Sequence, residues 1–224
     1  MTSIALRCAA GAALATALIY GPAAPSSAAP APAAAPAECL YNPAQHTGAP
    51  KDLGTPSAKP AHAGPVKATL KTNRGDINLD LDGEKAPCAV NSFTFLAQKN
   101  FFDKTDCHRL ANGPGMKMLQ CGDPTGTGSG GPGYEFANEN TGGATYPKGT
   151  VAMANEGPDT NGSQFFLVYG DSQLPPDYTP FGKITSGIDL LEAVGEAGDD
   201  GSSSAGGGKP RMNVGIEDVV IAQP

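Results

Sequence analysis

The chain has 224 residues and a formal net charge of −7, with 15 Lys and Arg against 22 Asp and Glu. This acidic balance argues against a nucleic-acid-binding protein, because a surface that follows phosphates needs an excess of basic side chains. The 30 Gly and 21 Pro, with 39% hydrophobic residues and no Trp, disfavour a helical bundle. They leave a turn-rich β domain or a partly disordered chain.

Residues 1–29 have the three-part layout of a secretory signal peptide. Arg7 precedes an apolar run from Cys8 to Tyr20, and small residues follow around Ser26, as in segments that direct export. The run of 13 residues is too short to span a bilayer as a helix. We therefore expect a protein that is secreted or associated with the cell envelope and has no stable membrane span; a disordered Ala/Pro tail is the alternative.

Residues 30–65 remain rich in Pro, Ala and Gly without any hydrophobic periodicity. Such a composition is typical of an extended, disordered tether. The sequence therefore predicts that the folded domain occupies residues 66–224.

From Val66 onward the pattern is that of an ordered β domain. Residues 66–70 and 76–81 alternate apolar and polar side chains around a turn, which predicts a β-hairpin. Pro87 suits the first turn of a helix, and apolar residues recur at helical spacing up to the neighbourhood of Asn100. We expect a second helix over residues 187–194, and further strands over residues 107–110, 116–121, 150–154, 164–168, 181–184 and 214–220.

About eight short strands and two helices predict a mainly β fold, a closed eight-stranded antiparallel barrel with a helix over each open end. A doubly wound fold is disfavoured, because two helices cannot cover both faces of a parallel sheet. The stretch from Gly198 to Gly208 is interpreted as a flexible connection before the last strand.

The sequence lacks the residue patterns that several common kinds of functional site require. The three histidines are isolated, and there is no Cys-x-x-Cys pair or His-Glu-x-x-His motif, which argues against a zinc site. The run Gly126–Gly131 matches a dinucleotide-binding pattern, but Pro132–Gly133 follows it instead of a helix that would hold the pyrophosphate. We expect neither a metal nor a cofactor.

A series of short motifs recurs in order along the folded part of the chain. The motifs are His108–Arg109–Leu110, Met118–Asp123, the glycine run from Gly126, Met153–Asn155, Asn161–Phe166 and Phe181–Lys183. In order and approximate spacing this series resembles the cyclophilin family of peptidyl-prolyl cis-trans isomerases, in particular exported bacterial members. The resemblance covers about residues 66–222 and implies a barrel capped by two helices, the fold expected above from the element count.

The resemblance also implies a non-covalent mechanism that needs no nucleophile, metal or cofactor. Arg109 matches the catalytic arginine, which hydrogen-bonds the prolyl amide as the bond twists. Gln120 matches a group that grips the substrate backbone. The residues that match the proline pocket and its surroundings are Phe166, Met118, Leu174, Ala154, Asn155, Gly126, Gln164 and Tyr178.

The sequence departs from the family pattern around this pocket. Lys117 stands where an aromatic residue is frequent, the loop from Ala111 to Gly115 is longer than in most members, and Met116 is a candidate for part of the pocket wall. Gln173 replaces the Trp of drug-binding members. We therefore expect weak cyclosporin affinity, because the indole donor is missing.

Four cysteines remain after the predicted signal peptide, and four cysteines allow three pairings. We favour Cys88 with Cys107, which would tie the first helix to the strand that carries Arg109, and then Cys39 with Cys121. Four buried free thiols are the alternative.

Two functions from different classes are consistent with these residues. The first is a monomeric, exported prolyl isomerase that acts on unfolded or extended proline-containing polypeptides. The second is a catalytically weak, cyclophilin-like module that binds peptides or serves as a chaperone.

Overall fold

The computed structural model describes residues 38–45 and 51–222, which belong to one compact unit of the chain. The predicted signal peptide and the first part of the predicted tether lie outside the described residues. No helix within the described ranges is long and apolar enough to cross a bilayer.

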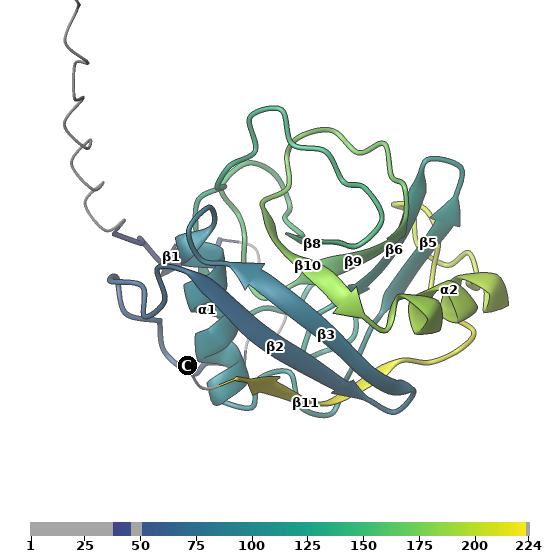
Figure 1. Cartoon of the computed structure of the whole chain (residues 1–224), viewed down its shortest axis with the longest axis horizontal. Coiled ribbons are helices and arrows are strands. Elements are labelled where there is room, and N and C mark those ends of the chain that lie inside the picture. The colour runs from purple at the N-terminus through teal and green to yellow at the C-terminus, as the bar shows by residue number, and fades with distance from the viewer. Residues whose placement is uncertain (1–37, 46–50, 223–224) are drawn as a thin grey trace, which may run out of the picture. The chain divides into compact units, whose positions relative to one another are not determined.

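A curled antiparallel sheet forms the body of the domain (Figure 1). Its order is β4-β11-β2-β3-β10-β8-β9-β6-β5, and a two-stranded sheet pairs β1 with β7. The helices are α1 (Pro87–Gln98) and α2 (Ile188–Ala197), at opposite ends of the sheet in Figure 1. The strands are β1 (Asn42–Pro43), β2 (Pro65–Thr72), β3 (Gly75–Asp82), β4 (Thr105–Asp106), β5 (Arg109–Gly113), β6 (Met116–Cys121), β7 (Tyr134–Glu135), β8 (Thr150–Met153), β9 (Phe165–Gly170), β10 (Pro180–Ser186) and β11 (Gly215–Ile221).

The prediction of a closed eight-stranded barrel is wrong, although the mainly β composition and the two helices are confirmed. The sheet has nine strands and stays open between its edge strands β4 and β5. These two strands are consecutive in the chain, and β4 has only two residues, which pair with β11. Beyond β6, β5 meets only an isolated bridge from Leu110 to Gly208 within the described residues, so no ladder among them closes the barrel.

The predicted hairpin forms as β2 and β3, with Ala68 opposite Leu79 and Leu70 opposite Ile77. These four side chains are buried, as the apolar and polar alternation requires. The turn ends at Gly75, whose φ of +126° is readily adopted only by glycine.

Helix α1 buries its apolar face against the sheet, with Phe93 between Phe102, Phe165 and Phe181. Its N-cap residue, Ala86, provides no side-chain acceptor. The carboxylate of Glu139 takes this role from a distant loop and accepts hydrogen bonds from the backbone N–H groups of Cys88 (2.9 Å) and Ala89 (2.8 Å). Burial raises the pKa of Glu139, and these two hydrogen bonds oppose the rise.

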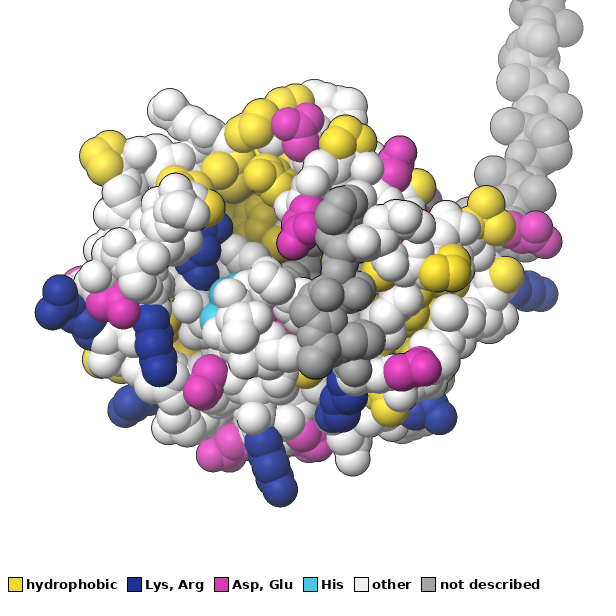
Figure 2. All heavy atoms as spheres, turned by 180° about the vertical axis from the view of Figure 1, so that it is seen from behind, with side chains coloured by type: hydrophobic (Ala, Val, Ile, Leu, Met, Phe, Trp, Pro, Cys, Tyr) yellow, Lys and Arg dark blue, Asp and Glu magenta, His cyan; other side chains and the backbone are white. Residues whose placement is uncertain are grey.

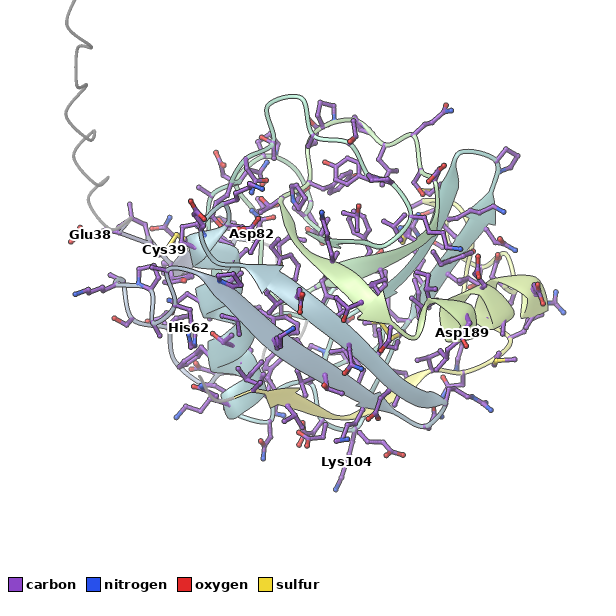
Figure 3. The ribbon with its side chains drawn as sticks, viewed as in Figure 1. Glu38, Cys39, His62, Asp82, Lys104 and Asp189 are labelled. Atoms are coloured by element: carbon purple, nitrogen blue, oxygen red, sulfur yellow. A yellow bond between two sulfur atoms is a disulfide. The ribbon has the colours of Figure 1, made fainter. Side chains whose placement is uncertain are left out.

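Part of the segment predicted as a disordered tether lies against the domain. We call its described residues, 38–45 and 51–64, the strap. The ring of Tyr41 packs edge-on against Tyr134 at 5.2 Å between centroids, and the Asn91 side chain bonds Ser57 O and Ala61 N. Figure 3 shows Glu38, Cys39 and His62 of the strap on the α1 side of the molecule. Composition predicted disorder here because it contains no information about these contacts.

All four cysteines after the predicted signal peptide form disulfides, but the predicted pairing is wrong. Cys39 pairs with Cys88 (Cα–Cα 5.4 Å), and Cys107 pairs with Cys121 (Cα–Cα 4.0 Å). The strap brings Cys39 to the start of α1. The antiparallel pairing of β5 with β6 brings Cys107, just before β5, beside Cys121 at the end of β6.

The contact between Glu139 and α1 gives a stability prediction. Glu139→Ala removes both acceptors of the first helical turn and should lower the free energy of unfolding by about 1–2 kcal/mol. Urea denaturation measures the change, with Glu84→Ala at an exposed position before α1 as the control. Equal stabilities for the two variants would contradict the capping role.

Candidate functional site

A groove of about 950 Å³ crosses one face of the domain. In Figure 2 hydrophobic side chains gather in a hollow on the face turned away in Figure 1, with a basic side chain at the margin. The groove lies over the end of the sheet that contains β5, β6, β8 and β9. Among the residues that line it are Arg109, Met118, Gln120, Gly126, Ala154, Asn155, Gln164, Phe166, Leu174 and Tyr178, which are all the substrate-site residues predicted from the sequence.

Strand register brings the central residues of the site together. Arg109 on β5 pairs with Gln120 on β6, and Gln120 pairs in turn with Phe166 on β9. Paired residues of neighbouring strands lie on the same face of a sheet. One cation, one amide and one aromatic ring therefore stand in a row across three strands.

The apolar part of the groove is a cluster separate from the main core. Its buried members are Ala111, Met118, Tyr146, Ala152, Phe166 and Val168, and the partly buried Met116, Ala144, Ala154, Leu174 and Tyr178 pack against them. The rings of Phe166 and Tyr178 meet edge to face, with centroids 5.5 Å apart and planes at 87°. Met116 thus contributes to this pocket, as expected from the longer loop.

The guanidinium of Arg109 is held from three sides. Its Nη1 donates to Gln120 Oε1 (3.0 Å), its Nε to Gly206 O (2.9 Å) and its Nη2 to Ala205 O (2.6 Å). Burial lowers the pKa of Arg109, but an arginine keeps its charge in proteins. Within the described part of the chain, no carboxylate forms a salt bridge with it. The site therefore contains a fixed cation that is not neutralised by a neighbouring acid.

A chain of side-chain amides extends from the arginine. Gln120 Nε2 donates to Gln164 Oε1 (2.8 Å), and Gln164 Nε2 donates to Gly128 O (2.9 Å) and Gly130 O (3.0 Å). These bonds determine the orientation of both amides. Gln164, predicted to contact the substrate, thus also holds Gln120 in position beside Arg109.

The glycine-rich loop is organised by the buried carboxylate of Asp123. This carboxylate accepts hydrogen bonds from the backbone and hydroxyl of Thr125 and from the backbone of Gly128. Burial raises the pKa of Asp123, but the hydrogen bonds outweigh it and lower the pKa below its ordinary value. A Cβ on Gly130 would clash with Asp123 Oδ1, so this position requires glycine.

The opposite side of the groove is positioned by Asn155 and Tyr146. The Asn155 side chain donates to Asp177 O (2.9 Å), while Ala154 N donates to Gln164 O (2.9 Å). The hydroxyl of Tyr146 donates to Tyr178 O (2.8 Å) and accepts from Tyr178 N (3.0 Å). Sequence reasoning missed Tyr146, because it lies outside every recognised motif.

The Gly-rich stretch after α2 was predicted to be a flexible connection, but in the structure it forms hydrogen bonds with Arg109. Its carbonyls at Ala205 and Gly206 hold Arg109, and Asp200 Oδ1 accepts from Ser202 N (3.0 Å) and Lys209 N (2.9 Å). Backbone acceptors leave no side-chain pattern in a sequence, which is why this role was not predicted.

His108 lies in the groove wall next to Arg109. Burial lowers the pKa of His108 below its usual 6.5, while Asp123 opposes the shift and Arg109 adds to it. Neither ring nitrogen has a hydrogen-bond partner among the described residues, which also contain no group of three His, Cys, Asp or Glu placed to hold a metal ion.

Comparisons with known proteins show the family of the chain. Residues 67–221 match the family described as cyclophilin type peptidyl-prolyl cis-trans isomerase/CLD. The chain is 44% identical over 199 residues to a probable peptidyl-prolyl cis-trans isomerase B of Mycobacterium tuberculosis, covering 83% of this chain and 64% of the relative. It therefore spans somewhat less than two thirds of that relative's length.

Two further proteins are covered almost completely. Peptidyl-prolyl cis-trans isomerase A of M. tuberculosis is 39% identical over 174 residues, which cover 69% of this chain and 91% of that protein. The crystal structure of a cyclophilin type peptidyl-prolyl cis-trans isomerase of Cryptosporidium parvum superposes with a TM-score of 0.61 at 33% identity, covering 71% of this chain and 99% of that one.

The environment of His108 predicts a pH dependence of stability. The unfolded chain binds a proton at this residue as the pH falls through 6.5, whereas the folded chain does so only at lower pH. The contribution of the neutral His108 side chain to the free energy of unfolding is therefore fully present above pH 6.5 and is lost on acidification. Urea unfolding at about pH 7.5 and about pH 5.5 should show a smaller loss for His108→Gln than for the wild type. The same loss in both proteins would refute the assignment.

Proposed function

Because the chain belongs to the cyclophilin-type peptidyl-prolyl cis-trans isomerase family, we propose that it catalyses cis-trans isomerisation of X-Pro bonds. The observation that carries this proposal is the placement of Arg109, a cation without an acidic partner in the described residues, in one row with Phe166 at the edge of an apolar pocket. A proline ring fits the pocket while its amide faces the guanidinium.

The barrier to be lowered is amide resonance. Rotation about a peptide bond meets roughly 18–20 kcal/mol, and an X-Pro bond takes tens to hundreds of seconds to isomerise unaided. As the bond twists, conjugation is lost and the prolyl nitrogen gains a free lone pair. A donor aimed at this nitrogen stabilises the twisted state more than the planar one, because the nitrogen lone pair can accept a hydrogen bond only when conjugation is lost. Arg109 is such a donor, and no covalent step is needed.

The other residues hold the substrate while the bond turns. Phe166, Met118 and Leu174 enclose the proline ring, so that the chain before the proline rotates relative to a fixed ring. Gln120 and the backbone of Asn155 bond the substrate chain. Gln164 keeps Gln120 oriented through a 2.8 Å hydrogen bond, and this preorganisation spares the site from reorganising during each turnover.

We propose that the substrates are unfolded or extended polypeptides of exported proteins and that the chain acts as a monomer. One solved C. parvum relative was crystallised in the presence of the dipeptide Ala-Pro, which supports proline-containing peptides as ligands. The two disulfides are typical of proteins in oxidising compartments and support export, in keeping with the signal-like residues 1–29.

Arg109→Ala tests the catalytic proposal. Removing the donor should lower kcat/KM on a short X-Pro peptide by about 100-fold or more, with little change in melting temperature. Arg74→Ala is the matched control, because this exposed arginine also donates from Nε to a backbone carbonyl, Asn213 O, but lies outside the groove. If the wild type and Arg109→Ala catalyse equally poorly while both bind the peptide, the chain is a binding module instead.

Cyclosporin should bind weakly. Gln173 is exposed beside Gly115, to whose carbonyl its N–H donates (2.8 Å), and it offers no indole donor to the drug. Gln173→Trp should tighten inhibition about tenfold, the equivalent of roughly one hydrogen bond. An inhibition constant of the wild type already in the nanomolar range would refute this explanation.

A further inference from the structure

We propose that the strap is a second wall of the substrate groove and contacts residues of the polypeptide beyond the X-Pro pair. The inference rests on the proposed isomerase function, because it assigns a longer substrate to the same site. The composition of these residues predicted a tether with no part in recognition.

The strap borders the groove directly. Strand β1 pairs with β7, with Asn42 opposite Glu135 and Pro43 opposite Tyr134. Next to this ladder, Ala44 N donates to Gly133 O (3.1 Å). Ala44 lines the same groove as Arg109 and Phe166, as do Tyr134 and Glu135 on β7. One strand of the strap thus continues the groove wall that β7 begins.

The strap is attached firmly enough to act as a binding surface. The Cys39–Cys88 disulfide ties it to α1, and the Tyr41 hydroxyl donates to Cys88 O (3.0 Å). Farther along, Lys51 Nζ donates to Asn100 O (2.9 Å), just after α1, and Lys51 N donates to Gly131 O (3.3 Å). A wall that is ordered before binding loses little conformational entropy when a ligand docks.

The position of this wall indicates which part of a substrate it meets. The proline ring occupies the apolar cluster around Phe166, which contains no strap residue. Gln164, two residues before Phe166, donates to the carbonyls of Gly128 and Gly130, and the strap is bonded to the next residue, Gly131. A polypeptide that runs from the pocket along the glycine-rich loop therefore reaches Ala44 only with residues beyond the X-Pro pair.

The lining at this end also indicates the chemistry of the occupant. Ala44 and Pro132 present small apolar surfaces, while Glu135 and Glu156 line the same groove. An extended segment with neutral or basic residues fits these groups, whereas acidic residues would meet like charge. The occupant assigned to this wall is thus the flanking part of an unfolded, proline-containing chain.

Ala44→Phe, with Ala58→Phe as control, tests the inference on the full chain. Ala58 is an exposed strap residue that does not line the groove. Two peptides are compared, a blocked four-residue X-Pro peptide and the same peptide extended by four residues at both ends, which adds about 13 Å of chain on each side. Ala44→Phe should raise KM for the long peptide at least about fivefold, equivalent to about 1 kcal/mol. Its kcat on the long peptide, and both kcat and KM on the short peptide, should stay at the wild-type values. Ala58→Phe should behave like the wild type on both peptides.

A second variant, Cys39→Ser with Cys88→Ser, releases the strap without adding bulk and should abolish the KM advantage of the long peptide. Unchanged discrimination in both variants would overturn the inference, and so would an equal loss on both peptides, since the strap would then only support the fold. A wild type that turns over the short peptide but binds the long one no better contradicts the strap's role alone. A wild type inactive on both peptides contradicts the isomerase function itself.

Discussion

The antiparallel register of β5, β6 and β9 is the constraint on which the site depends. It places Arg109, Gln120 and Phe166 at paired positions of three strands, so that a charged donor and an apolar pocket share one face at strand spacing. A shift of one of these strands by one residue would turn its side chain to the other face. The Cys107–Cys121 disulfide joins the chain at the ends of β5 and β6, immediately beside the Arg109–Gln120 pair, and opposes such a shift.

The two faces of the sheet contribute to two different clusters of apolar side chains. One face packs with α1 and α2 into the main core, while the other forms the smaller cluster around Phe166 and Met118. Phe166, Met118 and other members of the smaller cluster line the groove. The polar groups beside it are bonded to one another or to backbone carbonyls. The groove thus combines hydrogen-bonded polar groups with an apolar cluster, which is the combination that the proposed isomerase function requires.

Local patterns predicted the local parts of this structure well. Alternation identified β2 and β3, and Pro87 marked the start of α1. The ten site residues predicted from the family resemblance all line the groove. Long-range relations were not predictable in the same way. The open sheet edge, the pairing of Cys39 with Cys88 and the docking of the strap depend on which distant segments meet, and composition contains no information about that. Tyr146 was missed because its function is to bond a backbone, which no motif records.

The way Arg109 is held has a consequence for how the site tolerates change. Two of its partners are main-chain carbonyls, of Ala205 and Gly206, so the grip depends on the path of the loop and not on the side chain at Ala205. That exposed residue is free to vary over evolutionary time without releasing the guanidinium. Gly207 is different, because a Cβ there would clash with the backbone oxygen of Leu110, and its φ of +74° is readily adopted only by glycine. Substitution in this Ser- and Gly-rich loop is therefore restricted only at positions where a side chain would clash with neighbouring backbone. Two related proteins can differ in sequence at the other positions of the loop and still hold the arginine in the same way.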